Sequence, residues 1–455
     1  MAKRAASQLE YVCHECGHRS PRWLGRCPRC DGWNTFDELI EPRVSASASR
    51  GELAKPIAIG EARSAVQPRI VTGIDEFDRV LGGGLVQGMA VLIGGDPGIG
   101  KSTLLMQALA SLCARDHACL YVTGEESENQ VALRAQRLDA KGVEKVELLA
   151  TTDMPTAAAA IGSAKYAAVV LDSIQTLSTP EIASAPGTVG QLRAVTSDAI
   201  ALAKSKGVAL FLIGHITKDG AIAGPKVLEH LVDTVLSFEG DRDHGHRVLR
   251  SSKNRFGPAH ELGVFEMRDT GLIAVADPSG MFLQERLEGA SGSVVVPTAN
   301  GSRPMLLELQ ALVVSAAYGA ARRIGSGVDA NRLSVLLAVL EKRAGLHVLD
   351  HDVFASIAGG IAVSERALDL GWLLAIASSF LERPMPKRSV AFGEVGLLGE
   401  VRAVERATER IEEAVKLGFE RVFLPRHNLE KMRNKPKGAE LVGITTVQEA
   451  VSVLS

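Results

Sequence analysis

The most specific chemical pattern in the sequence is a glycine-rich run at residues 95–103, Gly-Asp-Pro-Gly-Ile-Gly-Lys-Ser-Thr. The run matches G-x4-G-K-[ST], and it lies between an apolar segment at 89–94 and a segment of helical pattern at 104–114. Between a buried strand and a helix, such a loop directs backbone N–H groups and the positive end of the helix dipole at phosphates. The sequence therefore predicts a nucleotide-binding loop formed by Gly95, Asp96, Pro97, Gly98, Ile99, Gly100, Lys101, Ser102 and Thr103.

Three side chains complete a predicted site for ATP and Mg²⁺. Lys101 should reach the β- and γ-phosphates, and the Ser102 hydroxyl should be a ligand of Mg²⁺. Asp172 ends the apolar run at 168–171, so its carboxylate is expected at the carboxyl edge of a sheet, where the nucleotide also lies. There it would hold Mg²⁺ through a water molecule.

Glu125 and Glu126 follow the apolar run at 119–122. One of these carboxylates could orient and deprotonate the attacking water during ATP hydrolysis. The alternative is an acidic pair at a helix N-terminus, where the helix dipole favours negative charge.

Four cysteines near the start of the chain have metal-ligand spacing. Cys13, Cys16, Cys27 and Cys30 form the pattern C-x2-C-x10-C-x2-C, in which four thiolates can surround one Zn²⁺ ion as a closed structural site. Two disulfides are the alternative, but residues 1–8 contain no apolar segment typical of a secretory signal. The other two cysteines, Cys113 and Cys119, are expected to be small buried residues.

The elements that position these groups have a regular order. Apolar runs at 119–122, 168–171, 208–213 and 234–238 alternate with helical patterns, which predicts a mostly parallel sheet with helices on its faces. We predict a four-cysteine zinc module at 1–35, a linker at 36–68, an ATPase domain at 69–278 and a further domain at 279–455.

The amino-acid composition excludes several classes of protein. Of the 455 residues, 46% are hydrophobic and 23% are charged, which excludes a largely disordered chain. No apolar run is long enough for a membrane-spanning helix, so the predicted location is the cytoplasm with no membrane partner. The net charge of -2 excludes a globally basic nucleic-acid binder, and 4% aromatic residues disfavour a base-stacking platform.

Several motifs resemble known families. The segments 72–78 and 81–85, followed by the P-loop, resemble the RecA-type ATPase core. In that core the catalytic glutamate follows the strand after the P-loop helix, a position that Glu125 matches better than Glu126. The segments 214–220, 224–230 and 253–257 resemble the RadA family, also called Sms, of bacterial DNA-recombination ATPases.

This resemblance implies binding of single-stranded and branched DNA, branch migration driven by ATP hydrolysis, a RecA-type recombinase as partner, and a hexameric ring. Lys253 and Arg255 would then contact either a neighbouring subunit's γ-phosphate or DNA phosphates. An ordinary basic loop is the alternative. His215 would sense the γ-phosphate, and the segments 178–190 and 217–224 would be mobile loops that face DNA.

Residues 279–455 resemble the Lon-protease-like domain, chiefly through the segment 393–404. Lon-type proteolysis needs a serine and a lysine, but Asp369 falls near the serine position and Thr408 near the lysine position. We therefore expect a proteolytically inactive scaffold for oligomerisation and DNA binding. Its basic residues available to DNA would include Arg303, Arg322, Arg323, Lys342, Arg343 and Arg402.

The predicted fold class is α/β, with a RecA-like P-loop ATPase core, an N-terminal four-cysteine zinc module and a C-terminal α+β Lon-protease-like domain. An ATP-dependent protease is the alternative function, and the missing serine–lysine pair argues against it. A zinc-containing DNA-binding scaffold that uses nucleotide only as a structural ligand is a second alternative. Glu125 together with Asp172 argues against that scaffold.

Overall fold

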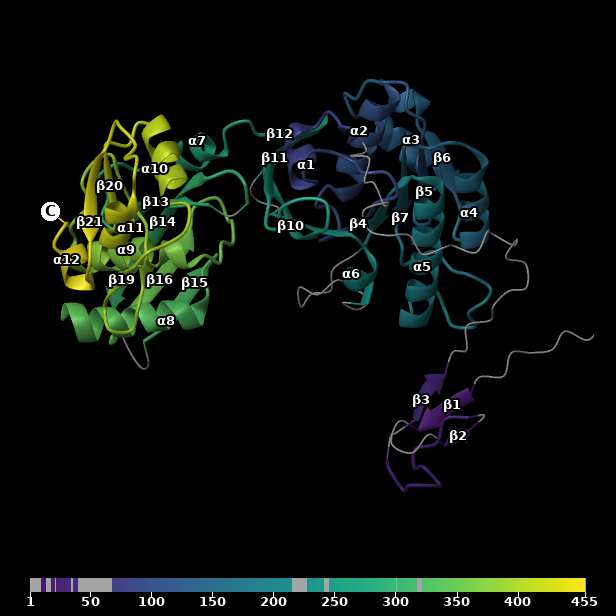
Figure 1. The fold of residues 1–455 in the computed structure, drawn as a ribbon, viewed down its shortest axis with the longest axis horizontal. Coiled ribbons are helices and arrows are strands. Elements are labelled where there is room, and N and C mark those ends of the chain that lie inside the picture. The colour runs from purple at the N-terminus through teal and green to yellow at the C-terminus, as the bar shows by residue number, and fades with distance from the viewer. Residues whose placement is uncertain are drawn as a thin grey trace, which may run out of the picture. The chain divides into compact units, whose positions relative to one another are not determined.

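The computed structural model describes residues 10–13, 18–20, 22–33, 36–39, 68–214, 227–240, 245–299, 301–316 and 321–454 (Figure 1). The chain divides into two compact units, Met1–Val66 and Gln67–Ser455. In the first unit the described strands form an antiparallel sheet in the order β2-β1-β3. These strands are β1 (Glu10–Cys13), β2 (Arg19–Ser20) and β3 (Phe36–Leu39). Because β3 pairs with β1, the folded module continues past the boundary at residue 35 that we predicted.

The first half of the second unit is built on a nine-stranded sheet in the order β12-β11-β10-β9-β4-β8-β7-β5-β6. The strands from β9 to β6 in this order are parallel, and β10, β11 and β12 extend the sheet in antiparallel fashion. The strands are β4 (Ala90–Gly95), β5 (Cys119–Thr123), β6 (Glu147–Ala150), β7 (Ala168–Asp172), β8 (Ala209–Ile213), β9 (Thr234–Glu239), β10 (His246–Asn254), β11 (Leu262–Arg268) and β12 (Gly271–Ala274).

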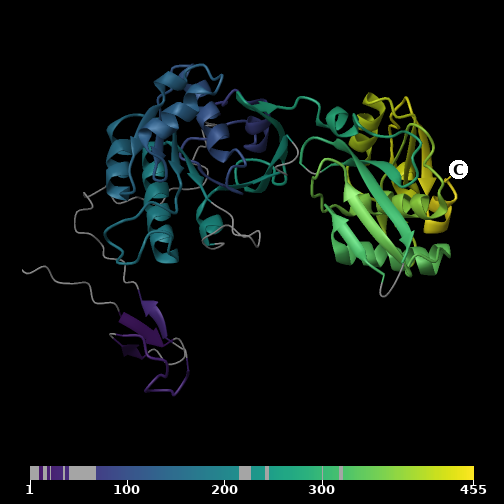
Figure 2. The ribbon, with the colours of Figure 1, turned by 180° about the vertical axis from the view of Figure 1, so that it is seen from behind.

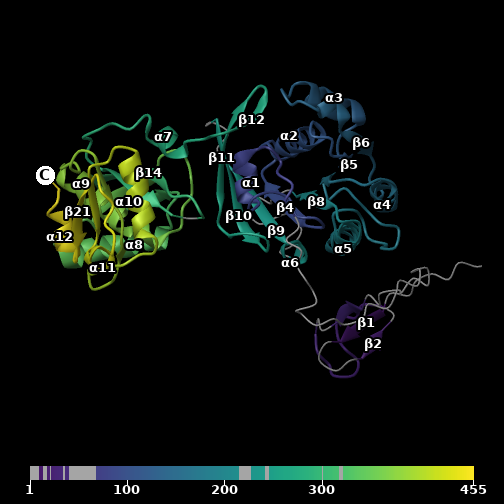
Figure 3. The ribbon, with the colours of Figure 1, turned by 45° about the horizontal axis from the view of Figure 1, so that its top comes forward.

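Helices cover both faces of this sheet, which confirms the predicted α/β class. Figure 3 shows α2 on one side of the strands and α4 and α5 on the other. Strands β4, β5, β7 and β8 are buried at every residue, because a parallel strand between two helical layers meets apolar groups on both faces. The helices are α1 (Asp75–Val80), α2 (Lys101–Cys113), α3 (Glu128–Gln136), α4 (Met154–Ser163), α5 (Val189–Lys206) and α6 (Val227–Leu231).

A side chain of α2 is bonded to the edge strand β12. The Gln107 amide oxygen accepts from the Leu272 N–H at 2.9 Å, and its Nε2 donates to the Leu272 carbonyl at 3.2 Å. Gly271 allows this approach, since a Cβ atom there would lie 2.8 Å from Gln107 Nε2. The helix that begins at the P-loop is therefore joined to the strand that leads towards the C-terminal half of the unit.

The second half is built on a seven-stranded mixed sheet in the order β15-β16-β14-β13-β17-β20-β21. Its strands and the separate hairpin β18–β19 are β13 (Ser293–Thr298), β14 (Met305–Ser315), β15 (Arg323–Ser326), β16 (His351–Ile357), β17 (Ser389–Ala391), β18 (Glu394–Val395), β19 (Val401–Arg402), β20 (Arg421–Pro425) and β21 (Glu440–Ile444). Its helices are α7 (Pro278–Leu283), α8 (Ala330–Val339), α9 (Asp369–Leu381), α10 (Ala407–Lys416), α11 (Arg426–Lys431) and α12 (Val447–Val451).

Two cores lie on the two faces of this second sheet. The larger core packs α8 and α9 against one face, and a smaller core packs α10 against the other face over β13, β17 and β20. None of the described helices is long and apolar enough to span a membrane.

Candidate nucleotide-binding site

The predicted P-loop lies between β4 and α2, as the sequence pattern indicates. Gly95, Gly98 and Gly100 have φ angles of +156°, +79° and +116°. Packing also restricts side chains at two of these positions, most strictly at Gly95, where the neighbouring atom belongs to the backbone. A Cβ atom would lie 2.7 Å from the Phe238 carbonyl oxygen at Gly95 and 2.8 Å from Met267 Cε at Gly100. The loop therefore keeps its backbone close to the sheet on one side and open at Gly98, where a Cβ atom would meet nothing within 4 Å.

Lys101 is the buried cation of this loop, with only 4% of its surface exposed. Its ammonium donates to the carbonyl oxygens of Gly95 at 2.7 Å and Asp96 at 2.9 Å. Burial lowers the pKa of Lys101, and the nearby carboxylates of Asp172, Asp96 and Glu125 oppose that effect. A buried ammonium held over the loop fits the negative charge of nucleotide phosphates.

The two predicted Mg²⁺ groups lie together. Ser102 Oγ donates to Asp172 Oδ2 at 2.7 Å, which joins the first turn of α2 to the carboxyl end of β7. The Tyr121 hydroxyl donates to the same carboxylate oxygen. Burial and the Asp172 charge raise the pKa of Tyr121 well above its usual value, so the phenol stays protonated and acts as a donor. Oxygen groups of this kind suit Mg²⁺.

Tyr121 is a site residue that the sequence analysis did not identify. It lies within the buried strand β5, where every residue is buried. Arg134 Nη2 donates to the Tyr121 hydroxyl at 3.2 Å, so α3 also contacts this group. The one available signal was a tyrosine inside an otherwise apolar strand, since a buried phenol normally has a hydrogen-bond partner.

The two candidate glutamates point to different partners. Glu125 accepts a hydrogen bond from the hydroxyl of Ser173, the residue after Asp172, so it lies beside the Ser102–Asp172 pair. Glu126 instead forms an ion pair with Arg134 at 2.6 Å. Both residues precede Ser127, the N-cap of α3. The geometry favours Glu125 as the group nearest the phosphate end of the site.

Lys253 and Arg255 lie at the amino ends of the parallel strands, whereas the P-loop lies at their carboxyl ends. Asn254 pairs with Thr234, the first residue of β9, whereas the P-loop follows the last residue of β4. Lys253 and Asn254 belong to strand β10, so the alternative of an ordinary basic loop is wrong for these two residues, and the bend begins at Arg255. The Lys253 ammonium donates to the carbonyl oxygens of Glu229 and Val232, at 2.7 and 2.8 Å.

At the same end of the strands, the segments 81–85 and 253–257, which are far apart in the sequence, lie in contact. Arg255 forms an ion pair with Asp233 at 3.2 Å, and Asn254 Nδ2 donates to the Val80 carbonyl at 3.4 Å. A Cβ atom at Gly257 would lie 2.8 Å from the Cα atom of Gly82. The glycines of segments 81–85 and 253–257 therefore let two backbones touch.

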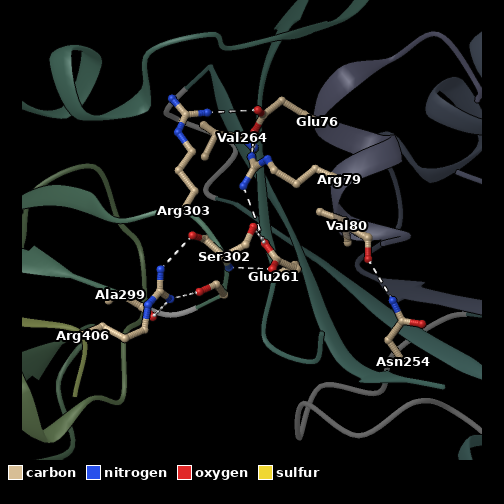
Figure 4. A network of polar contacts seen from close by, with 11 residues as sticks. Glu76, Arg79, Val80, Asn254, Glu261, Val264, Ala299, Ser302, Arg303 and Arg406 are labelled. Atoms are coloured by element: carbon tan, nitrogen blue, oxygen red, sulfur yellow. Dashed lines mark hydrogen bonds and ion pairs between the residues drawn. The ribbon is translucent and has the colours of Figure 1, made fainter. Parts of the chain in front are cut away.

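Helix α1 continues this contact into the C-terminal half of the unit (Figure 4). Arg303 forms an ion pair with Glu76 at 3.2 Å, and Glu76 also pairs with Arg79. Glu261 accepts from the Ser302 N–H at 2.6 Å, and Arg406 donates to the Ser302 carbonyl at 2.8 Å. Two buried glutamates thus hold Ser302 and Arg303 against α1 and the residue before β11.

Several basic residues proposed for DNA contact already have carboxylate partners. Arg303 pairs with Glu76, and Arg322 pairs with Asp352 at 2.6 Å. Arg402 pairs with Glu400. These ion pairs partly neutralise the three arginines, and contact of these residues with DNA stays a prediction. Arg323 is exposed at the edge strand β15, and Lys342 and Arg343 lie in the helical turn at Leu340–Ala344.

The structure describes some, but not all, of the predicted DNA-facing loops and both cysteines outside the zinc motif. The segment 178–190, expected to be a mobile loop that faces DNA, is bonded to the buried side chain of Gln191, which donates to the carbonyls of Thr179, Ile182 and Ser184. Its contact with DNA stays a prediction. His215 and the segment 217–224 lie outside the described residues. Cys113 and Cys119 are buried as expected, and burial raises the pKa of both thiols.

Asp369, at the predicted serine position, is the first residue of α9 and is buried. It forms an ion pair with Arg332 and accepts from the Val395 N–H at 3.2 Å. Thr408 lies in the first turn of α10. A carboxylate fixed by an arginine in this way offers no nucleophilic hydroxyl.

The described part of the cysteine motif forms a tight turn. The Cys27 N–H donates to the Gly32 carbonyl and the Asp31 N–H donates to the Cys27 carbonyl, both at 2.9 Å. Cys27 is completely buried beside Tyr11 and Leu24, and Cys30 is exposed. Cys13 ends β1, and Cys16 lies outside the described residues. A turn that places two cysteines three residues apart around a hydrogen-bonded loop fits one half of a four-thiolate zinc site.

Replacing Cys30 with serine should release the zinc, about one ion per chain, because three thiolates hold Zn²⁺ less tightly than four. The first unit should unfold while ATP binding by the second unit persists. Elemental analysis and nucleotide binding measure the two effects, and Cys113→Ser is the matched control. Wild-type protein without zinc would refute the site.

Comparison with known proteins agrees with this geometry. Residues 70–160 match the KaiC family of ATPases, and residues 11–38 match the rubredoxin metal binding domain. The chain is 46% identical to the DNA repair protein RadA of Bacillus subtilis over 453 residues, which covers 98% of both chains. It is 46% identical to RadA of Listeria monocytogenes and 47% identical to RadA of Halalkalibacterium halodurans, with 99% of each chain covered. A P-loop ATPase core and an N-terminal metal-binding module are thus confirmed, and the chain belongs to the RadA family of DNA repair proteins.

Proposed function

We propose that this protein is a DNA-dependent ATPase of homologous recombination, which binds single-stranded and branched DNA and drives branch migration beside a RecA-type recombinase. The observation that carries the proposal is the cluster of Lys101, Ser102, Asp172 and Glu125 at one edge of the sheet. Its groups match the charges and proton transfers that hydrolysis of a phosphoanhydride requires.

Each residue has a distinct task in this proposal. Lys101 would turn its ammonium from the loop carbonyls to the β- and γ-phosphates. Ser102 and Asp172 would hold Mg²⁺, which when bound neutralises charge on the phosphates. Glu125 would accept the proton of the attacking water. Its hydrogen bond with Ser173 sets the direction of its carboxylate beside Asp172.

The separation of Lys253 and Arg255 from the P-loop, at opposite ends of the strands, supports an oligomer. Within one chain, Lys253 and Arg255 lie at the end of the strands opposite the P-loop, so they cannot contact that chain's own nucleotide. In this proposal they act on a neighbouring subunit's phosphates or on DNA, since a ring of subunits places different surfaces of neighbouring copies in contact. We favour coupling to DNA, because Arg255 and Gly257 lie in a short polar bend directly after Asn254, the last residue of β10.

The ATPase rate with and without single-stranded DNA is the decisive measurement. We expect DNA to accelerate phosphate release. Unchanged phosphate release would instead support a scaffold that keeps nucleotide as a structural ligand. Hydrolysis of casein by the purified protein would support the protease alternative.

Replacing Lys253 with alanine should leave ATP binding intact and abolish productive branch migration. Mixing Lys253→Ala with Glu125→Gln subunits separates the two possible roles. Contact with a neighbour's nucleotide predicts that some mixed interfaces regain turnover. Contact with DNA predicts no rescue and a weaker salt dependence of DNA binding. Normal branch migration by Lys253→Ala would contradict both roles.

A further inference from the structure

One face of the seven-stranded sheet is partly uncovered by helices. Side chains alternate between faces along a strand, so Leu309 and Ala311 of β14 are buried towards α9, whereas Leu312 points the other way and is 56% exposed. Leu312 pairs with Phe354 of β16, which pairs with Ile324 of β15. These three residues, here named the apolar row, lie side by side on the uncovered face. Figure 2 shows the green strands of this sheet in front.

A cavity of about 510 Å³ lies over the apolar row. Its lining includes the apolar row, Leu287 and Glu285. Leu287 is 76% exposed and Ile324 is 52% exposed. We name this cavity the apolar pocket. Exposed apolar surface of this kind is typical of a protein–protein contact rather than of free surface.

A second exposed apolar feature projects from the same half of the chain. Leu397 and Leu398, at the tip of the hairpin between β18 and β19, are 69% and 74% exposed. The tip is fixed by hydrogen bonds from the Gly396 N–H to the Glu400 carbonyl at 2.9 Å and from the Leu398 N–H to the Glu400 carboxylate at 3.1 Å. We name residues 395–401 the leucine hairpin. Two leucines on a rigid turn lose little conformational freedom on binding.

The two features lie on opposite sides of the sheet. The leucine hairpin contacts α8 and α9, because the Val395 carbonyl accepts from Arg332 at 2.7 Å and its N–H donates to Asp369. Helices α8 and α9 pack on the face opposite the apolar pocket. A hairpin and a pocket on opposite faces suit a contact between two copies of the chain.

Charge at the two features is complementary. Glu285, at the apolar pocket, and Arg366, beside the leucine hairpin, are both exposed. Neither forms an ion pair with another of the residues that the structure describes. Opposite charges flanking an apolar contact favour one orientation of the two surfaces.

We propose that the leucine hairpin of one copy inserts into the apolar pocket of the next copy, with Arg366 facing Glu285. The proposal rests on the oligomer inferred under "Proposed function" and identifies where its C-terminal halves meet. Two different surfaces make a head-to-tail contact, which closes into a ring when the rotation between copies permits.

Sedimentation of the full-length protein over a concentration series tests the proposal. The hairpin variant Leu397→Asp/Leu398→Asp and the pocket variant Leu312→Asp/Ile324→Asp should each raise the concentration needed for assembly by about tenfold or more. Leu349→Asp, an exposed leucine of the same half outside both features, is the matched control. If both variants assemble at the same concentration as the wild type, the proposal is wrong. This holds even if the variants have lost DNA binding. A monomeric wild-type protein would overturn the oligomer as well, whereas DNA-stimulated ATP hydrolysis tests the enzyme separately.

Mixing separates a head-to-tail contact from a symmetric one. The hairpin variant keeps an intact pocket and the pocket variant keeps an intact hairpin. At a concentration where neither variant assembles alone, an equal mixture should therefore form dimers and no larger ring. A symmetric contact predicts no such dimer and would overturn the proposal.

Cross-linking gives a readout that does not depend on weakened assembly. In a chain with both Leu398→Cys and Leu312→Cys, mild oxidation should produce a ladder of linked subunits, because a disulfide forms only between close residues. The single variants and the wild type should give no ladder. Absence of a ladder in a double variant that assembles normally would refute insertion.

Discussion

Replacing Lys101 with methionine should reduce ATP turnover by a factor of about 10²–10³ or more, the cost of losing one charged donor at developing phosphate charge. Methionine retains the length and apolar body of the side chain but removes the ammonium that donates to Gly95 and Asp96. The phosphates then lose their main cation within the chain. Phosphate release and binding of a fluorescent ATP analogue measure the effect.

Lys206→Met is the matched control, because Lys206 is an exposed lysine at the end of α5 that donates to the Gly162 carbonyl at 3.4 Å. This control should bind and hydrolyse ATP at the wild-type level. If Lys101→Met also binds ATP with wild-type affinity and releases phosphate at the wild-type rate, the assignment of the P-loop lysine is wrong.

Replacing Glu125 with glutamine should slow hydrolysis by about 10²–10⁴-fold, the usual contribution of a positioned general base. Glutamine keeps the size of the side chain and can still accept from Ser173, so ATP should bind with near wild-type affinity. Single-turnover hydrolysis measured beside ATP affinity separates the two quantities.

Glu126→Gln provides the matched comparison one residue away. It weakens the ion pair with Arg134, in which both side chains are about a third exposed. Partly exposed pairs contribute about 0–1 kcal/mol, so we expect a small loss of stability and little change in rate. Wild-type turnover in Glu125→Gln together with slow turnover in Glu126→Gln would reverse the assignment.

The nucleotide site could be predicted from sequence because its signals are local. The P-loop pattern, the apolar run before it and the helix after it all lie within residues 89–114. Asp172 was recognisable because it ends an apolar strand, and parallel strands bring their carboxyl ends to one edge. The role of Tyr121 was not recognisable. The apolar pattern of its strand predicts that the residue is buried, but not that its hydroxyl donates to Asp172.

Long-range pairing explains what the sequence did not reveal. The charge of Arg303 is visible in the sequence, but its partner Glu76 is 227 residues away. The position of Lys253 within a strand was not recognisable, because the antiparallel extension β10–β12 depends on strand order rather than on a local pattern. The apolar row likewise exists only through the register of three strands.

The pair of hydrogen bonds between Gln107 and Leu272 makes the edge strand β12 a reporter of the nucleotide site. Any displacement of α2 when phosphate enters the P-loop must stretch these bonds or carry β12 along, and β12 is followed within a few residues by α7. The Leu272 amide proton would then exchange with solvent deuterium at a rate set by nucleotide occupancy. We therefore expect hydrogen exchange at the Leu272 amide, outside the P-loop, to follow ATP binding in solution without a label on the nucleotide.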